Sequence, residues 1–162
     1  MERAVELAGF FAAHGIWCVA EGETLVPILA LQRADGAQEF RRIQGDELRE
    51  AVAQGKEWLA GNHEDVLCAV LVYDGFIPLP SGKTDCLMLE VRSYGPARQS
   101  LSIALPYRHA DKAGGFVVHR PKFLCSQEEK GTVSDLGEAF FRGVARHEKG
   151  CAVWNAHLDE SK

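Results

Sequence analysis

Apolar positions recur at helical spacing in three parts of the chain. In the first, apolar residues three or four positions apart fall on one face of a helix that we expect to end at Gly15. The second begins at Asp46, a favourable N-cap residue, and the third follows the capping pattern Thr132-x-x-Asp135. The pattern therefore predicts three helices, over residues 2–14, 46–60 and 133–149.

Between these helices the apolar residues form short runs or alternate with polar ones, as in β-strands. The run at residues 66–72 (VLCAVLV) has the length and valine content of a central strand covered on both faces. Asp35-Gly36 separates two strand candidates and predicts a hairpin, because both residues tolerate positive φ. Pro27 lies in the first of these candidates and indicates an edge strand or a bulge. The other predicted strands are residues 16–19, 24–32, 39–43, 87–94, 101–107 and 116–124.

The order of these segments determines the expected fold class. Strands that follow one another without intervening helices form antiparallel sheets. The sequence therefore predicts an α+β fold, in which three helices pack on a mostly antiparallel sheet. No internal repeat or linker divides the chain, so we expect one domain over residues 1–150 and a C-terminal tail over residues 151–162.

Composition limits the partners and the compartment. The chain has 162 residues, 46% of them hydrophobic, and a net charge of −5, which argues against nucleic acid or an anionic membrane as its main partner. No apolar run approaches the roughly 18–20 residues of a transmembrane helix. The five cysteines are scattered and odd in number, which favours free thiols in a reducing compartment. A cytoplasmic location is expected.

Gly82-Lys83-Thr84 matches the end of a nucleotide-binding P-loop, G-x-x-x-x-G-K-[ST]. The first glycine of that motif is replaced by Ile77, and Pro78 and Pro80 remove backbone N–H groups that would hold phosphate. Strand-like sequence follows where the motif needs a helix. We therefore expect a solvent-exposed hairpin loop here.

A second motif suggests a metal-dependent hydrolase. Asp74 on one strand and Glu90-Val91-Arg92 on the next resemble the metal-binding hairpin of PD-(D/E)xK nucleases, with Arg92 in the lysine position and Asp85 as a spare acid. That resemblance implies that Asp74 and Glu90 hold a divalent cation between them. The two side chains share a face of the sheet in only one of two possible registers.

Other catalytic and metal-binding patterns are weak. The chain has neither an HExxH motif nor a G-x-S-x-G elbow. His147, Cys151 and His157 lack the short paired spacings of structural zinc sites, so His147 is better explained as a charge at a helix C-terminus. No cofactor is expected.

The segment 98–122 carries the strongest candidate for binding. Between residues 108 and 122 four basic residues stand against one acid, although the chain as a whole is acidic. A hairpin through residues 110–115 would gather these side chains into a patch that accepts an anion, unless they pair with surface acids instead. The predicted ligand-binding residues are Tyr107, Arg108, His109, His119, Arg120 and Lys122.

The sequence thus favours a small cytosolic protein without enzymatic activity, a binding or interaction module. Its partner is expected to be an acidic or phosphate-bearing small molecule or a protein segment. A homodimer formed by pairing of the Pro27 edge strand, or by helix packing, is a further possibility. The alternative function is a divalent-metal-dependent hydrolase or nuclease-like enzyme that uses Asp74 and Glu90.

Overall fold

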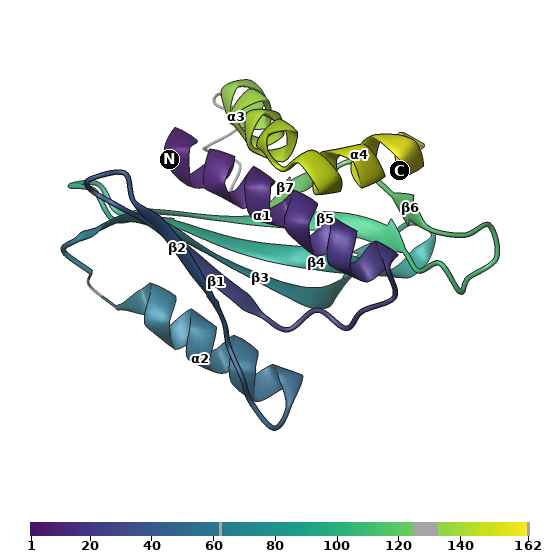
Figure 1. The fold of residues 1–162 in the computed structure, drawn as a ribbon, viewed down its shortest axis with the longest axis horizontal. Coiled ribbons are helices and arrows are strands. Elements are labelled where there is room, and N and C mark those ends of the chain that lie inside the picture. Colours follow the sequence, from purple (N-terminus) through teal and green to yellow (C-terminus); the bar gives the residue numbers. More distant parts are fainter. Residues whose placement is uncertain (62, 125–132, 162) are drawn as a thin grey trace.

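The computed structural model describes residues 1–61, 63–124 and 133–161 (Figure 1). Its helices are α1 (Glu2–Ala20), α2 (Leu48–Ala60), α3 (Val133–Arg146) and α4 (Glu148–His157). Its strands are β1 (Ile28–Arg33), β2 (Gln38–Arg42), β3 (Val66–Leu79), β4 (Gly82–Ser93), β5 (Gln99–Arg108), β6 (Val117–Val118) and β7 (Lys122–Leu124).

The strands form one seven-stranded antiparallel sheet in the order β2-β1-β3-β4-β5-β6, with β7 also paired to β5. The α+β class and the antiparallel sheet are as predicted. The chain has four helices rather than three among the described residues. Of these described helices, none combines the length and apolar character needed to cross a bilayer.

Helices cover both faces of the sheet (Figure 1). On one, the three-helix face, lie α1, α3 and α4, and α2 lies on the other, the α2 face. Alternation along β3 explains both layers: Val70 and Val72 join the larger core under the three helices, while Ala69 and Leu71 join the smaller core under α2. The prediction of a central strand covered on both faces is confirmed for residues 66–72.

Helix α1 is longer than the sequence predicts, because Gly15 does not end it. Residues 16–19, which we expected to form a strand, continue the helix to Ala20 and bury Ile16 and Val19. A Cβ atom at Gly15 would lie 2.7 Å from Leu87 Cδ1, so glycine allows α1 to approach the sheet closely here. Close packing, not a chain turn, explains this glycine.

The C-terminal region also differs from the prediction. The third predicted helix breaks at His147, whose Nδ1 accepts a hydrogen bond from the Gly150 backbone N–H and caps α4. The expected tail instead contains most of α4, with Trp154 buried in the main core. The predicted Thr132 cap and Cys125 lie outside the described residues, and Cys18, Cys68, Cys86 and Cys151 are free.

The edge of the sheet lies one strand further out than predicted. Pro27 precedes β1, and β1 is an inner strand between β2 and β3. The hairpin at Asp35-Gly36 is confirmed: Gly36 has a φ of +91°, and the Asp35 carboxylate accepts a hydrogen bond from the Ala37 N–H. The predicted strand at 116–124 divides into β6 and β7 around Pro121, which cannot donate a ladder hydrogen bond.

Candidate functional site

The six residues of the predicted basic patch have separate local roles. Tyr107 is 1% exposed, and its hydroxyl donates to the Asp74 carboxylate at 2.7 Å on the three-helix face. His109 Nε2 lies 3.3 Å from that hydroxyl and 3.8 Å from an Asp85 oxygen. Arg108 donates to the carbonyl oxygens of Gly114 and Gly115 and so fastens the loop between β5 and β6.

The remaining members of the patch either contact residues near the C-terminus or lie on the α2 face of the sheet. His119 is 1% exposed, with Nδ1 3.3 Å from the Asp159 carbonyl oxygen. Arg120 forms an ion pair with Glu160 at 3.2 Å. Lys122 is opposite Ala104 in the β5–β7 register, so its side chain lies on the α2 face, away from Tyr107. The structure therefore does not bring the six residues together on one exposed face.

Asp74 and Glu90 lie on opposite faces of the sheet. Asp74 follows Val72 on the three-helix face, whereas Glu90 is opposite Leu71, whose side chain belongs to the core under α2. A cation could not contact both carboxylates through the sheet. Among the described residues, no group of three or more histidine, cysteine and acidic side chains is arranged to hold a metal ion.

Asp74, Tyr107 and His109 form a cluster whose members hydrogen-bond to one another. Because the Tyr107 hydroxyl donates to Asp74, the same oxygen is free to accept from the His109 Nε2–H. Burial raises the pKa of the Asp74 carboxyl, and it also raises the pKa of the Tyr107 hydroxyl above the ordinary value of 10.0. Desolvation causes both pKa shifts. The hydrogen bond between the two side chains compensates for their burial, as is usual for buried polar groups.

On the α2 face, Glu90 is the centre of a second polar group. Its carboxylate accepts hydrogen bonds from Ser102 at 2.7 Å and from Tyr73 at 3.2 Å. Lys56 of α2 approaches it to 3.6 Å, and Arg92, two residues further along β4, to 3.9 Å. Hydrogen bonding to Tyr73 raises the pKa of Lys56, so the ammonium group remains charged.

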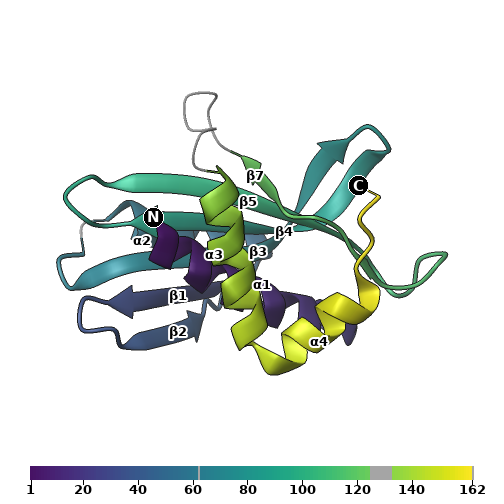
Figure 2. The same cartoon turned by 90° about the horizontal axis from the view of Figure 1, so that it is seen from above.

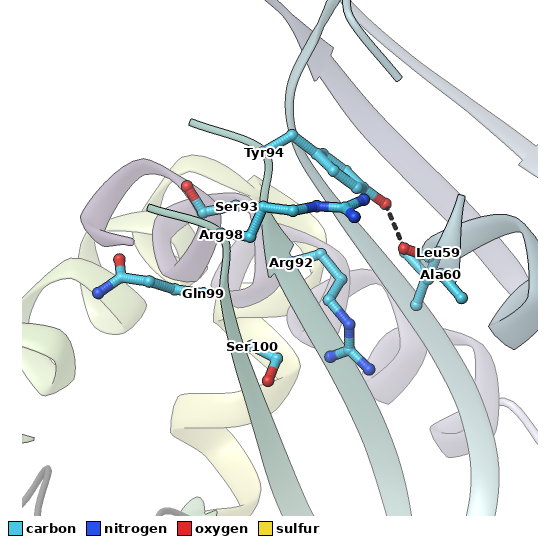
Figure 3. Close-up of a pocket in the computed structure, with 8 residues that line it drawn as sticks. All are labelled: Leu59, Ala60, Arg92, Ser93, Tyr94, Arg98, Gln99 and Ser100. Atoms are coloured by element: carbon cyan, nitrogen blue, oxygen red, sulfur yellow. Dashed lines mark hydrogen bonds between the residues drawn. The ribbon is translucent and has the colours of Figure 1, made fainter. Parts of the chain in front are cut away.

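Beyond Arg92 the same face opens into a pocket of about 230 Å³ at the C-terminal end of α2. Figure 3 shows the Arg92 and Arg98 guanidinium groups and the Tyr94 ring on the side of the strands that faces Leu59 and Ala60. Ser100 is opposite Arg92 in the β4–β5 register and so shares its face. The side chains of the other two lining residues, Ser93 and Gln99, point to the opposite side (Figure 3).

The end of α2 holds the pocket in shape. The Tyr94 hydroxyl donates to the Leu59 carbonyl oxygen at 2.9 Å, and Arg98 donates to the Gly61 carbonyl oxygen. The Arg98 guanidinium also lies 5.4 Å from the centre of the Tyr94 ring. These contacts satisfy carbonyl groups that every helix leaves unpaired at its C-terminus, where positive charge is favourable.

The pocket differs in charge from the protein around it. Lys56, Arg92 and Arg98 are three cations along one strip of the α2 face, and Glu90 is the carboxylate among them. Arg92 has 30% of its side chain exposed and contacts the Val91 carbonyl oxygen at 2.9 Å. Since a guanidinium carries five N–H donors, both arginines retain donors for a bound anion beyond these described contacts.

Sequence reasoning divided the residues of this pocket between two different predictions. Arg98 is the first residue of the predicted segment 98–122, and Arg92 was assigned to the nuclease-like motif. The signal for this site was two arginines on either side of a short turn, with Arg92 near the end of β4 and Arg98 directly before Gln99 begins β5. In an antiparallel hairpin, the end of one strand and the start of the next lie side by side.

Comparisons of the chain with protein-family models, curated proteins and solved structures give no match.

Proposed function

We propose that this protein is a binding module without enzymatic activity that accepts an anionic group in the pocket formed by Arg92, Arg98 and Ser100. The observation that carries the proposal is that two arginines, Arg92 and Arg98, line one open pocket of a chain whose net charge is −5. On an acidic protein, the average composition of the surface does not explain a cluster of cations, whereas a bound anion would.

The chemistry of the pocket favours a phosphate or carboxylate group. Arginine presents a planar fork of donors that fits two oxygens of either group, and the hydroxyl of Ser100 adds a neutral donor. A volume of about 230 Å³ suits a single phosphate-bearing or carboxylate-bearing moiety. The ligand would be a small metabolite or an acidic segment of a protein. The acidic remainder of the chain makes a long polyanion such as nucleic acid a poor fit.

Glu90 limits which anions bind. Its carboxylate is 12% exposed and already interacts with Lys56 and Arg92, so part of the positive charge is neutralised before a ligand arrives. A doubly charged phosphomonoester gains more from the remaining charge than a single carboxylate does. We therefore expect phosphomonoesters to bind more tightly than monocarboxylates of similar size.

A thermal-shift screen tests the proposal with inorganic phosphate, phosphomonoesters and dicarboxylates as probes. A ligand that binds only the folded protein raises the melting temperature by mass action. We expect a rise for wild type and for Arg49→Ala, whose arginine is exposed at the start of α2, and no rise for Arg92→Ala. Because Arg98→Ala also loses a contact with the end of α2, its melting temperature with ligand is compared with that of the same variant without ligand.

The same screen includes the outcomes that would contradict the proposal. A shift that survives in Arg92→Ala and is lost in Arg108→Ala plus Arg120→Ala would return the site to the β5–β6 region. A shift that requires a divalent metal and is lost in Asp74→Ala would favour the hydrolase instead. If none of the anions shifts wild type at millimolar concentrations, the pocket has no anion-binding function.

The compartment is part of the same proposal. The four described cysteines are all free, which supports a reducing environment such as the cytosol. Burial raises the pKa of Cys68 to about 11 and of Cys86 to about 12, so these thiols stay protonated at neutral pH. They act as small apolar side chains of the core.

A further inference from the structure

Strand β2 is an open edge of the sheet. It pairs with β1 on one side only, and all five of its residues are exposed. Figure 2, seen from above, shows β2 as the outermost strand, with β1 beside it. An edge of this kind presents unpaired N–H and C=O groups to any chain that can align with it.

The hydrogen bonds at the ends of the β1–β2 hairpin show which of these groups are free. The Ala37 carbonyl accepts from Arg33 N–H, and the Ile43 N–H donates to the Pro27 carbonyl, so residues 37 and 43 direct their backbone groups toward β1. Backbone direction alternates along an antiparallel strand. The backbone groups of Gln38, Phe40 and Arg42 therefore point away from the sheet.

We propose that β2 pairs antiparallel with β2 of a second copy of this chain, about a two-fold axis at Phe40. In this register Phe40 is opposite Phe40 of the partner subunit, and Gln38 is opposite Arg42 of the partner subunit. All the outward-facing residues of both strands then meet in hydrogen-bonded pairs, and no outward backbone group of residues 38–42 is left unpaired.

The side chains of β2 are complementary to themselves in this register. Glu39 comes directly opposite Arg41 of the partner subunit, and symmetry repeats the contact. These positions are non-hydrogen-bonded pairs, in which the facing side chains come closest. Glu39 and Arg41 share the α2 face with their β1 partners Leu31 and Leu29. A pair of opposite charges thus forms on each side of the axis.

On the three-helix face, Phe40 supplies the apolar contact. Its side chain is 54% exposed although its ring lies 5.4 Å from that of Phe11 and 6.2 Å from that of His14. Pairing would bring the two Phe40 rings together at the axis and cover surface that the monomer leaves in water. Exposure of a large aromatic residue at the middle of an edge strand fits this use.

The charges of β2 do not protect the edge from a second copy. Protected edges carry a proline, a bulge or charges of one sign that repel an identical strand. The sequence Gln38–Arg42 has no proline, its pairing with β1 is regular, and an acid and a base stand symmetrically about Phe40. Since a five-residue strand buries less than a standard interface of about 1,600 Å², we expect dissociation in the micromolar range or weaker.

Sedimentation velocity across a concentration series tests this dimer. Wild type is expected to shift from monomer toward dimer between about 1 and 500 μM, a range that brackets the expected affinity. Glu39→Arg and Arg41→Glu each place like charges opposite one another and should remain monomeric. An equimolar mixture of these two variants restores both opposite-charge pairs, so it should form a heterodimer. Arg49→Ala, which changes an exposed residue of α2 outside the paired strand, should dimerise like wild type.

Three results would overturn the proposal. Wild type that stays monomeric throughout the range has no such dimer. Dimerisation that both single variants retain assigns the contact to another surface. Loss in both variants without recovery in the mixture shows that the Glu39–Arg41 register is wrong. Circular dichroism confirms that each variant is folded, and none of these substitutions touches Arg92, Arg98 or Ser100, so the outcome is independent of anion binding.

Discussion

Asp74 shows how a single buried carboxyl can couple stability to pH. It is held by the Tyr107 hydroxyl, and burial raises its pKa above the ordinary 3.8. The folded protein therefore binds this proton more tightly than the unfolded chain does. By linkage, the contribution of Asp74 to the free energy of unfolding is fully present below pH 3.8 and is lost as pH rises through the pKa of the folded state.

Asp74→Asn tests this coupling, because asparagine still offers an oxygen to Tyr107 but does not ionise. We expect the free energy of unfolding of the variant, relative to wild type, to increase as pH rises from 3.8 toward neutrality. Urea unfolding at several pH values measures it, with Asp35→Asn in the exposed β1–β2 turn as a matched acid-to-amide control. A difference between Asp74→Asn and wild type that is constant with pH would contradict the assignment.

The pair His14 and His147 has the opposite dependence on pH. Because His147 Nδ1 accepts from the Gly150 N–H, its proton is on Nε2, which donates to His14 Nδ1 at 3.0 Å. Burial is the main cause that lowers the pKa of both imidazoles. The unfolded chain therefore takes up these protons first, so stability is lost as pH falls below 6.5.

His147→Asn should reduce this acid sensitivity while it preserves the cap of α4, since asparagine is a good N-cap residue. Between pH 7 and the weakly acidic range, the variant should lose less of its free energy of unfolding than wild type does. His157→Asn, which substitutes a histidine near the end of α4 for which no such pair is described, is the control. An unchanged pH slope in His147→Asn would exclude the pair as its source.

At the scale of elements, the crossing of α1 and α3 depends on two glycines. A Cβ atom at Gly9 would overlap the Phe140 carbonyl oxygen, and one at Gly143 would overlap the Glu6 carbonyl oxygen. Both obstacles are backbone atoms of the facing helix, which cannot move aside as a flexible side chain can. The two helices therefore approach each other more closely than any other residue at these positions would allow.

Gly143→Ala should reduce the free energy of unfolding by about 3 kcal/mol, the upper range for overpacking, because the helices must separate. Gly137→Ala is the matched control in the same helix, since its added methyl group meets nothing within 4 Å among the described residues. There the better helix propensity of alanine should stabilise by about 0.5–1 kcal/mol. Equal effects in chemical denaturation would contradict the close crossing.

The local sequence pattern predicted helices, strands and turns correctly where interactions between neighbouring residues determine them. The predictions of a hairpin at Asp35-Gly36 and of a strand at 66–72 were correct, because adjacent residues determine turn geometry and strand burial. Gly15 was misread because glycine ends a helix in one context and permits close packing in another. The contact that distinguishes the two is with Leu87, seventy-two positions away in the chain.

Long-range pairing likewise explains what sequence could not predict about the site. The charge run at 108–122 appeared free to bind an anion, but Arg120 is paired with Glu160 and His119 lies against Asp159. The register of β3 against β4 places Asp74 and Glu90 on different faces, and a shift of one residue would have reversed this. The excess of basic residues is visible in the local sequence, whereas the acidic residues that pair with them are distant in the chain and could not be predicted from it.

At the scale of the molecule, the proposed anion pocket and the proposed dimer edge lie on different strands. Arg92 lies on β4 and Arg98 directly precedes β5, whereas Phe40 is on β2, which β1 and β3 separate from β4 in the sheet order. The proposed dimer would thus extend the sheet at β2 and leave each pocket at the end of its own α2. Such a molecule would present two equivalent anion sites to a partner.

The most direct test of the central claim is an NMR titration that observes the arginine Nε–H signals during addition of inorganic phosphate. We predict saturable shifts for Arg92 and Arg98, with Arg108, Arg120 and the exposed Arg49 unchanged, and loss of the Arg98 response in Arg92→Ala. Saturable shifts at Arg108 or Arg120, with Arg92 and Arg98 silent, would contradict the account and restore the 108–122 segment as the binding site.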